Sequence, residues 1–457
     1  MERRFELRKE AMLAECEVSP QVFRGALERL VKFAEPFVEL LRQPAQRQHS
    51  ADYMSGLISD LGRKNVESIA YGRDQDRRNL QHFIGCAEWD HRPLMTELAR
   101  QVGQELGEDD GVIVFDPSGF PKQGKKSVGV ARQWCGRLGK VDNCQVAVYM
   151  AYVSRIDHAL TNTRLYLPEE WAKDRARRKA AGVPKHVRFQ TRHEQALEML
   201  DEQGHLLPHA WVGGDDEMGR NARFRTNLNG RSERYLLAVP CDTLIRDLDA
   251  KTPAYQGRGR LPKTPFVRVD QWRDALAEDA WTRIKVRDGE KGPLEVEVAA
   301  CRVQTKISQR VMKYEETLVI IRSLDETGAT KYDFYLSNAP RNTLVKEFAR
   351  VALAAHRVEE AIKRSKSQAG LSHYEVRNWP GWHHHQVLSL LATWFLVCES
   401  HRGKKMDAGD HRAADSRWDR HAPASNLSVR HADQNRQQQD ASPAPKRGSS
   451  LLPLQST

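Results

Sequence analysis

Two aspartates each follow a short apolar stretch of the kind that forms a buried strand. Asp116 comes directly after residues 112–115, which are β-branched or aromatic, and Asp215 comes after residues 210–214, which end in two glycines. If these strands are neighbours in one sheet, the two carboxylates converge at its edge. Carboxylate oxygens bind hard divalent cations, and a pair of such cations supports phosphoryl transfer. The structural alternatives are that Asp116 caps its own turn and that Asp215 caps a helix beginning near Gly219.

A third carboxylate, Glu359, falls within a long helix that the pattern predicts over residues 342–368. Lys363 lies one turn beyond it and Lys366 two turns beyond it, on the same side of the helix. If this side packs beside the sheet, it brings another acidic group and two cations to the aspartates. The alternative is an ordinary surface pair between Glu359 and Lys363, which contributes little to stability. Spacing alone does not choose between the two.

Positive charge follows the first aspartate closely. Within one loop and hairpin the cationic residues are Lys122, Lys125, Lys126, Arg132, Arg137 and Lys140. The 457-residue chain has 72 Lys and Arg against 61 Asp and Glu, so its formal net charge is +11. A basic surface around a carboxylate suits a polyanion such as nucleic acid. The alternative is a solvated lysine-rich loop.

Composition disfavours several other classes of protein. No apolar run approaches the roughly 20 residues of a membrane span, and the first residues lack the apolar core of a signal peptide, so a cytoplasmic protein without membrane association is expected. The seven cysteines are scattered with no CxxC spacing, which argues against a disulfide framework and a structural zinc site. The three histidines at 383–385 are a poor metal site, because consecutive helical residues diverge by about 100°.

The pattern of apolar residues divides the chain into parts that would position these side chains. We expect a helical DNA-binding domain over residues 1–105, an α/β core over 106–245 and 341–400, a β-rich insertion over 246–340, and a disordered tail over 401–457. The insertion contains Trp281, a residue type that stacks on unpaired bases, although a buried core tryptophan is the commoner outcome. A buried helix is predicted over 388–397.

Four segments of the chain carry a resemblance to a known family. They read VIVFDPSGFPKQGKKSVGVARQWCGRLGKVDNCQ, TRLYLPEEWAKD, WVGGDDEMG and RVEEAIKRSKSQAGLSHYEVRNWPGWHHH. In this order they resemble the DDE transposases of bacterial insertion sequences, in the branch with an RNase H-like core and a β-rich insertion before the last acidic residue. The resemblance covers roughly residues 20 to 400. It implies a mixed α/β sheet core of the RNase H type.

The resemblance also implies which residues form the site. The three acidic residues of the family fall on Asp116, Asp215 and Glu359, which would hold two Mg²⁺ or Mn²⁺ ions, and Lys366 matches the basic residue seven places after the glutamate. Gly219 matches a family glycine, whereas Met218 stands where a tyrosine is common. The turn before Glu359 departs from related branches, so Glu360 and Glu375 remain alternatives for the third acid. Asp216 and Glu217 are expected to point elsewhere.

A transposase of this kind would cut the ends of its element and join them to target DNA. The implied partner is double-stranded DNA, both as terminal inverted repeats and as target, with Lys122, Lys125, Lys126, Arg132, Trp281 and Lys366 contacting it. A homodimer on paired ends, associated with the nucleoid, is expected. Two alternatives stay open: a nuclease on the same core that does not transfer strands, and a catalytically inactive DNA-binding protein derived from a transposase.

Overall fold

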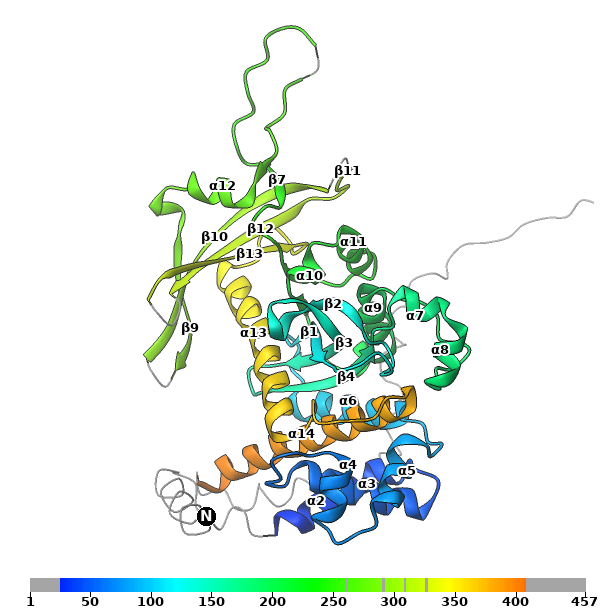
Figure 1. Ribbon diagram of the computed structural model, residues 1–457. Helices are drawn as coiled ribbons and strands as arrows, with labels where there is room; N and C mark the ends of the chain where they lie inside the picture. The colour runs from blue at the N-terminus through cyan, green and yellow to red at the C-terminus, as the bar shows by residue number, and fades with distance from the viewer. Residues whose placement is uncertain (1–24, 260, 290–291, 308–309, 325–327, 408–457) are drawn as a thin grey trace, which may run out of the picture.

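One mixed sheet runs through the molecule, with helices packed on it (Figure 1). The computed structural model describes residues 25–407 apart from 260, 290–291, 308–309 and 325–327. Across these residues the strand order is β2-β3-β1-β5-β6-β13-β12-β10-β7-β8, with β4 paired to β3 and both β9 and β11 paired to β10. None of the helices in the described part of the chain combines the length and the apolar character needed to cross a membrane.

The centre of the sheet has five strands: β4 (His158–Leu165), β3 (Lys140–Val153), β1 (Val112–Pro121), β5 (Trp211–Gly214) and β6 (Tyr235–Ala238). Strand β3 is antiparallel to both β4 and β1, whereas β1, β5 and β6 run parallel to one another. This order and these directions are those of an RNase H-like core, which confirms the predicted fold class. Strand β2 (Ala131–Cys135) extends the core as a hairpin with the first part of β3.

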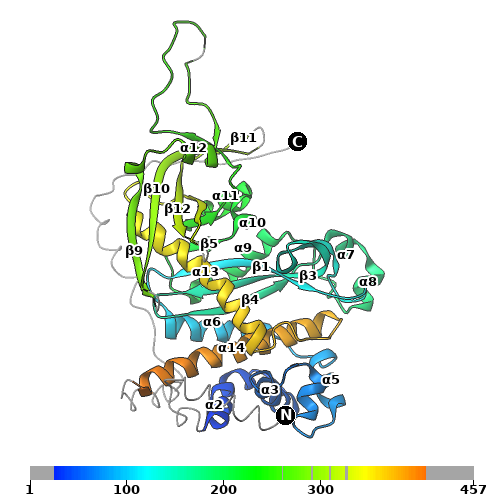
Figure 2. The ribbon, with the colours of Figure 1, turned by 60° about the vertical axis from the view of Figure 1, so that its left-hand side comes forward.

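Both faces of the central strands are covered. The residues of β3 from Cys144 to Val153 are buried without interruption. A strand covered on both faces reads as a continuous apolar run rather than an alternating one. The covering helices include α9 (Arg192–Gln203) and α13 (Val345–Gln368), and Figure 2 shows α13 crossing the sheet.

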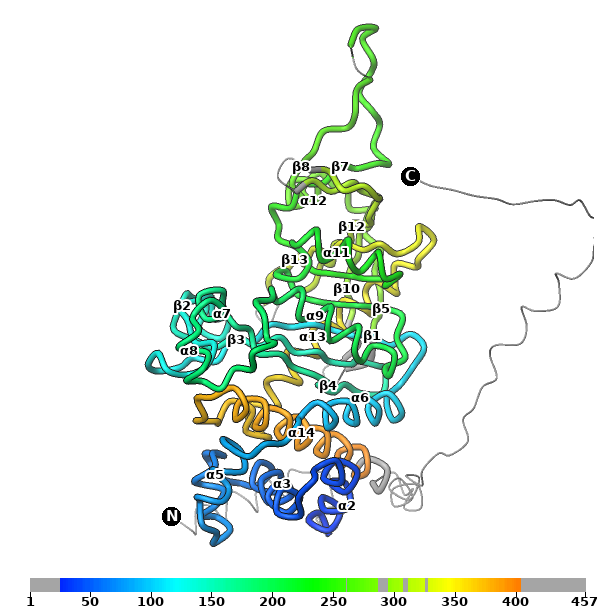
Figure 3. The backbone as a smooth tube through the Cα atoms, turned by 90° about the vertical axis from the view of Figure 1, so that its right-hand side faces the viewer, coloured from blue at the N-terminus to red at the C-terminus, as the bar shows by residue number. Residues whose placement is uncertain are grey.

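Within the predicted helical domain over residues 1–105, the described part from residue 25 is helical, and residues 1–24 lie outside the described residues. Its helices are α2 (Ala26–Val38), α3 (Pro44–Leu57), α4 (Val66–Tyr71), α5 (Arg77–Gly85) and α6 (Arg92–Leu106). Helix α14 (Trp379–Asp407) from the far end of the chain lies between these helices and β4 (Figures 1 and 3). Residues brought together in this way lie some 300 positions apart in the sequence, as in the contact between His384 and the carbonyl of Ile84.

Helix α14 is longer than the predicted buried helix over 388–397. It begins at Trp379, and its first turns contain His383, His384 and His385. These residues are polar, so the sequence pattern did not assign them to a buried helix, but all three are buried and hydrogen-bonded. It continues to Asp407, so residues 401–407 are helical where a disordered tail was predicted. The rest of that predicted tail, 408–457, lies outside the described residues.

The insertion is β-rich, but it continues the sheet of the core. Its elements are β7 (Leu244–Asp247), β8 (Val267–Arg268), α12 (Val269–Asp274), β9 (Thr282–Gly289), β10 (Gly292–Ile307), β11 (Arg310–Val311), β12 (Glu316–Leu324) and β13 (Thr330–Ser337). Strand β13 pairs antiparallel with β6 of the core, with Leu336 opposite Leu237. A separate small core lies under these strands and includes Ile245, Val303 and Leu318.

Three further helices lie in the loops of the core. They are α7 (Glu169–Lys173), α8 (Arg175–Ala180) and α11 (Ala222–Gly230). The first contains the buried Trp171, whose indole N–H donates to the carbonyl of Val130 at 2.7 Å.

Candidate active site

Asp116 and Asp215 lie on neighbouring parallel strands at the same point along the sheet. In the register of β1 and β5, Phe115 is opposite Gly214, and each aspartate is the next residue. Adjacent strands are about 4.8 Å apart, so the two backbones hold these side chains next to each other. The sequence predicted this convergence from the two apolar stretches alone.

Asp215 also caps a helix. Its Oδ1 accepts a hydrogen bond from the backbone N–H of Met218 at 3.1 Å, at the start of the short helix α10 (Asp216–Gly219). The capping role and a role in the site are therefore compatible, because the second carboxylate oxygen is not used by the cap. Helix α10 packs tightly on β6, since a Cβ on Gly219 would lie 1.8 Å from the carbonyl oxygen of Ala238.

Glu359 comes from α13, which packs against β1 and β5. Two turns later on this helix, the Lys366 ammonium donates to the Ser118 hydroxyl on β1 at 2.8 Å, which fixes the helix against the strand that carries Asp116. The alternatives for the third acid lie elsewhere: Glu360 pairs with Arg364 at 2.9 Å, and Glu375 pairs with Arg63 at 2.6 Å.

A cavity of about 1110 Å³ collects these side chains. Asp116, Asp215 and Glu359 all line it, whereas Glu360 and Glu375 do not. The polar and aromatic residues that share its wall are Ser118, Trp134, Arg137, Arg192, Asp216, Glu217, Arg220, Lys363, Lys366, Ser367, Ser372 and His373. The cavity is thus lined by both acidic and cationic side chains.

Crowding of negative charge changes the protonation of the two aspartates. Burial raises the pKa of Asp116 well above its usual range, the neighbouring Asp215 and Glu359 raise it further, and Lys366 opposes the shift. Burial also raises the pKa of Asp215 to about 7, against the lowering effect of the hydrogen bond from Met218. Both carboxyl groups therefore hold protons more tightly than an exposed aspartate does.

A divalent cation fits this donor set. Carboxylates whose pKa is raised by burial and mutual repulsion are relieved when a cation replaces the bound protons, and hard cations prefer such oxygens. Within the described residues no three His, Cys, Asp or Glu side chains already stand close enough together to hold one ion. The carboxylates share one cavity without being drawn to a common point.

The sequence prediction that Asp216 and Glu217 point elsewhere is wrong, because both line the cavity. The Glu217 carboxylate accepts from Arg192 at 2.5 and 2.6 Å, and its charge contributes to raising the pKa of Asp116 and of Asp215. Arg192 begins α9, where Thr191 and Glu194 form a capping box. That box predicts a helix start, but nothing in the sequence indicates that the start lies beside Asp215.

The cations and the tryptophan predicted to contact DNA lie in four different places. Lys125, Lys126 and Arg132 are exposed outside the cavity, and Lys366 lines it. The Lys122 ammonium lies over the Tyr374 ring at 3.5 Å, and burial lowers its pKa to about 8. Trp281 lies within the insertion, where Arg322 stacks on it at 4.5 Å, away from the cavity.

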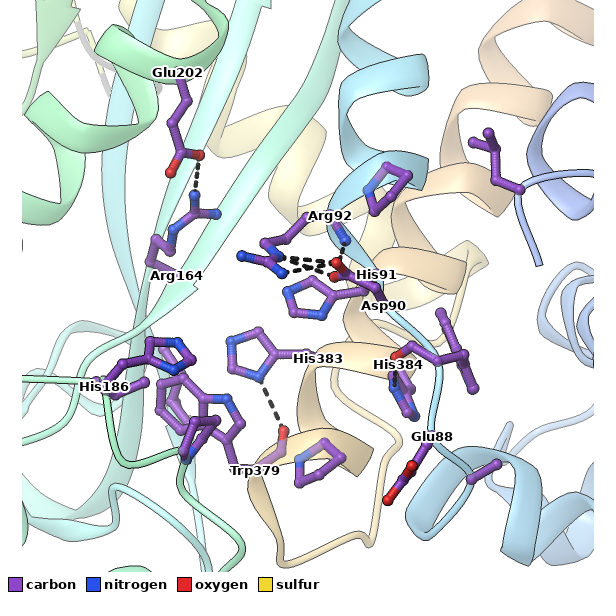
Figure 4. A pocket seen from close by; sticks show the side chains of 18 of the residues that line it. Glu88, Asp90, His91, Arg92, Arg164, His186, Glu202, Trp379, His383 and His384 are labelled. Atoms are coloured by element: carbon purple, nitrogen blue, oxygen red, sulfur yellow. Dashed lines mark hydrogen bonds and ion pairs between the residues drawn. The ribbon is translucent and has the colours of Figure 1, made fainter. Parts of the chain in front are cut away.

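A second cavity, of about 1000 Å³, lies between the N-terminal helices, β4 and α14 (Figure 4). Two ion pairs line it: Arg92 bonds Asp90 at 2.8 Å, and Arg164 pairs with Glu202. His383 reaches it but binds the carbonyl of Trp379 at 2.9 Å, and burial lowers its pKa, so the histidine run stabilises the packing of α14. Four carboxylates also line this cavity, but two of them, Asp90 and Glu202, are paired with arginines of its wall.

The six cysteines in the described part of the chain are free, which agrees with the prediction that no disulfide framework forms; Cys16 lies outside it. Cys135 and Cys144 are buried together below the β2–β3 hairpin. Met218, at the position where related proteins commonly have a tyrosine, is buried in the core.

Comparisons with known proteins give the family. Residues 36–293, more than half of the chain, match the family described as DDE superfamily endonuclease; this range contains Asp116 and Asp215 but ends before Glu359. A probable transposase for insertion sequence element IS701 from Microchaete diplosiphon is 39% identical over 95 residues, which make up 20% of this chain and 25% of that protein. The chain thus matches only about a quarter of the length of this relative.

Among solved structures, the cryo-EM structure of a piggyBac transposase synaptic complex with hairpin DNA aligns with 88% of this chain and 81% of its own, at 10% identity and a TM-score of 0.39. The strand order of the core and the family match are independent of this likeness. The chain belongs to the DDE superfamily endonuclease family and is similar to insertion-sequence transposases.

Proposed function

We propose that the protein is a transposase that cuts the ends of an insertion sequence and joins them to target DNA by metal-dependent phosphoryl transfer at Asp116, Asp215 and Glu359. One observation carries the proposal. Three acidic side chains from three remote segments line one cavity that also has cationic walls: Asp116 lies within β1, Asp215 follows the end of the adjacent parallel strand β5, and Glu359 lies on α13. Membership of an endonuclease family and similarity to an insertion-sequence transposase support the same function.

The three carboxylates would hold two Mg²⁺ or Mn²⁺ ions. When bound, such ions neutralise charge on the attacking and leaving oxygens of the phosphoryl group. The chain's own contribution is to hold the acids rigidly: β1 and β5 fix the aspartates, and the bond from Lys366 to Ser118 holds α13 and its glutamate against them. Lys366 also places a positive charge beside Asp116, which opposes the repulsion among the carboxylates.

The cations of the cavity wall would bind the phosphates that flank the scissile bond. Arg137 and Lys363 line the cavity beside the acidic residues, and Lys125, Lys126 and Arg132 extend the basic surface outside it. Such contacts position the DNA backbone without reading its sequence. Recognition of the terminal repeats would belong to the N-terminal helices, and a homodimer acting on paired ends at the nucleoid would hold both ends together.

The test uses the full-length protein, a duplex carrying the inverted repeats that flank its gene, and Mg²⁺. Wild type is expected to nick the repeat end and, when given a pre-cut end, to join it to a target plasmid. Asp116→Asn, Asp215→Asn and Glu359→Gln should each slow cleavage by about a hundredfold or more, equivalent to about 2.7 kcal/mol of transition-state stabilisation, while DNA binding is retained.

Glu360→Gln is the matched control. Glu360 follows Glu359 on the same helix but pairs with Arg364 and lies outside the cavity, so its neutralisation should leave cleavage unchanged. Cleavage by Asp116→Asn at the wild-type rate would refute the assignment of the site. Cleavage without joining of pre-cut ends would identify a nuclease, and binding without cleavage by wild type would identify an inactive DNA-binding protein.

A further inference from the structure

A long arm projects from the insertion at the end of the molecule opposite the N-terminal helices (Figures 1 and 3). Its described part consists of residues 248–259 and 261–266, between β7 and β8, which pair with each other at its base with Ile245 opposite Val267. Each limb has about nine residues, so the tip can reach up to roughly 30 Å from the base. From 250 to 259 the described residues are all exposed.

The base of the arm is held firmly. Arg246 donates to the carbonyl of Thr264 at 2.7 Å, and its guanidinium lies over the Phe266 ring at 4.1 Å. On the other limb, the carboxylate of Asp247 accepts from the backbone N–H groups of Asp249 and Ala250 at 2.8 and 3.1 Å. The arm therefore leaves the insertion in a defined direction, although its far part touches nothing else in the described chain.

The sequence of the arm keeps its backbone thin and extended. Pro253, Pro262 and Pro265 cannot donate to a strand ladder, so the two limbs do not form a hairpin of strands. At the tip, the Tyr255 hydroxyl donates to the carbonyl of Gly259 at 3.3 Å and closes a turn. Gly257 and Gly259 have φ of +78° and +82°, which requires glycine, and neither has any other atom within 4 Å of where a Cβ would be.

The charge of the arm is entirely positive beyond its base. Lys251, Arg258 and Lys263 are exposed and make no hydrogen bond or ion pair within the described residues. No Asp or Glu occurs from residue 250 to 266. Asp249, at the base of the arm, forms an ion pair with Arg341 at 2.8 Å. Arg258 therefore lies between two glycines at the tip of a thin arm, without a partner in the described part of the chain, and its guanidinium is free to bind another molecule.

We propose that this arm binds the minor groove of A·T-rich DNA, with Arg258 inserted into the groove. The minor groove is only about 6 Å wide, so it admits a side-chain-poor backbone such as Gly257-Arg258-Gly259 but not a helix or a strand pair. Narrow A·T grooves have an enhanced negative potential that attracts arginine, and the guanidinium is more easily desolvated than an ammonium. The arm would add a sequence preference distant from the acidic cavity.

Two other partners fit the arm less well. A protein surface would have to match the several cations of the arm and would gain little apolar burial, since the large exposed hydrophobic residues in its described part are Leu248, Tyr255 and Leu261. Phosphates alone would be bound by the lysines, but they give no reason for glycines on both sides of the arginine. The proposal rests on the proposed function only in that DNA is the partner; it does not need catalysis.

The experiment measures equilibrium binding of the full chain, in EDTA, to labelled duplexes of equal length. One duplex has a central A·T tract, one a G·C tract, and one an I·C tract, in which inosine removes the minor-groove amino group of guanine but leaves the C partner and the major-groove acceptors. Wild type should bind the A·T and I·C duplexes about fivefold more tightly than the G·C duplex. Arg258→Ala should bring all three affinities to within about twofold, and Arg258→Lys should retain part of the preference.

Lys313→Ala is the matched control, because Lys313 is an exposed cation of the same insertion that lies between β11 and β12 rather than on the arm. It should lower all three affinities equally and leave the preference intact. Equal binding of the three duplexes by wild type, or an I·C duplex that behaves like G·C, would overturn the minor-groove assignment. If wild type cleaves DNA but shows no preference among the three duplexes, the arm proposal is wrong and the proposed function stands. If wild type shows the preference but does not cleave DNA, the proposed function is wrong and the arm proposal stands.

Discussion

Glu316 joins the core to the insertion through a buried network of hydrogen bonds. Its carboxylate has no exposed surface and accepts from Arg225 at 2.8 Å, from the Tyr235 hydroxyl at 2.6 Å and from the Thr305 hydroxyl at 2.6 Å. Arg225 belongs to α11 and Tyr235 to β6 of the core, whereas Thr305 and Glu316 belong to the insertion. The Arg225 guanidinium also donates to the carbonyl of Gly219, at the end of the helix that Asp215 caps.

Glu316→Gln should destabilise the protein by about 3–5 kcal/mol, because it leaves the Arg225 guanidinium buried without its counter-charge. Urea unfolding monitored by tryptophan fluorescence measures the difference. Glu315→Gln is the control: the neighbouring carboxylate is 62% exposed and pairs with Arg302 at 3.3 Å, so it should cost less than about 1 kcal/mol. Equal effects of the two substitutions would show that the network does not join the two parts.

At this scale, only part of the cavity could be predicted from the sequence. Asp116 and Asp215 were identifiable because each ends an apolar stretch, which is a local signal. Glu217 and Arg192 were missed because their meeting depends on where α9 and α10 lie relative to each other, and no short-range pattern encodes that placement. To choose Glu359 rather than Glu360 as the third acid, one must know which face of α13 packs on the sheet, and the sequence alone did not show this.

Helix α10 shows how an element sets the position of one functional side chain. Its close approach to β6 leaves no space for a Cβ on Gly219, which would lie 1.8 Å from the carbonyl oxygen of Ala238. Asp215 forms the first cap of this helix, so a displacement of α10 moves the carboxylate. The position therefore couples backbone packing to the geometry of the acidic cavity.

Gly219→Ala should push α10 away from β6, cost about 1–3 kcal/mol in stability, and reduce cleavage even at temperatures where the protein is fully folded. Thermal unfolding and single-turnover cleavage measure the two effects. Gly136→Ala is the control, because Gly136 also lines the cavity but has nothing within 4 Å of the added methyl group. A Gly219→Ala protein with wild-type cleavage would show that α10 does not position Asp215.

Among the elements, those with local signals were the predictable ones. The apolar stretches indicated β1, β5 and β6, and the long periodic segment indicated α13, which begins at Val345 rather than at residue 342. The pairing of β13 with β6, which makes the insertion part of the core sheet, has no such signal, because it joins strands about 100 residues apart. The sequence predicted that the insertion is rich in strands, but it did not indicate which strands pair with one another in the sheet.

On the scale of the whole molecule, α14 holds the N-terminal helices to the sheet through buried histidines. The Nε2 of His385 donates to the carbonyl of Gly370 at 3.1 Å, so in the neutral ring Nδ1 accepts from the Tyr53 hydroxyl at 2.9 Å. The ring of His384 lies between the carbonyls of Ile84 and Trp89 in the N-terminal part, with its two nitrogens 2.9 and 3.0 Å from their oxygens, and the neutral ring donates to one of them. Sequence reasoning did not predict that these polar rings would form the packed face of the helix.

Burial lowers the pKa of His385 to about 3, and the nearby charge of Lys122 contributes to the lowering. An unfolded histidine has a pKa of about 6.5, so between these values the unfolded state binds one more proton than the folded state. The free energy of unfolding should therefore fall as the pH drops below about 6.5, by about 1.4 kcal/mol per pH unit for this one ring. His91, whose pKa burial also lowers to about 3, should add a similar slope.

His385→Gln isolates this effect, because glutamine does not titrate and its amide can replace both hydrogen bonds. Urea unfolding at pH 4, 5 and 6 should show a pH slope smaller than that of wild type by about 1.4 kcal/mol per pH unit. Between pH 7.5 and 8.5 the ring is neutral in both states, so the two proteins should there have the same slope, which serves as the internal control. Parallel curves from pH 4 to 6 would mean that His385 is protonated in the folded protein and that α14 is not held by a neutral ring.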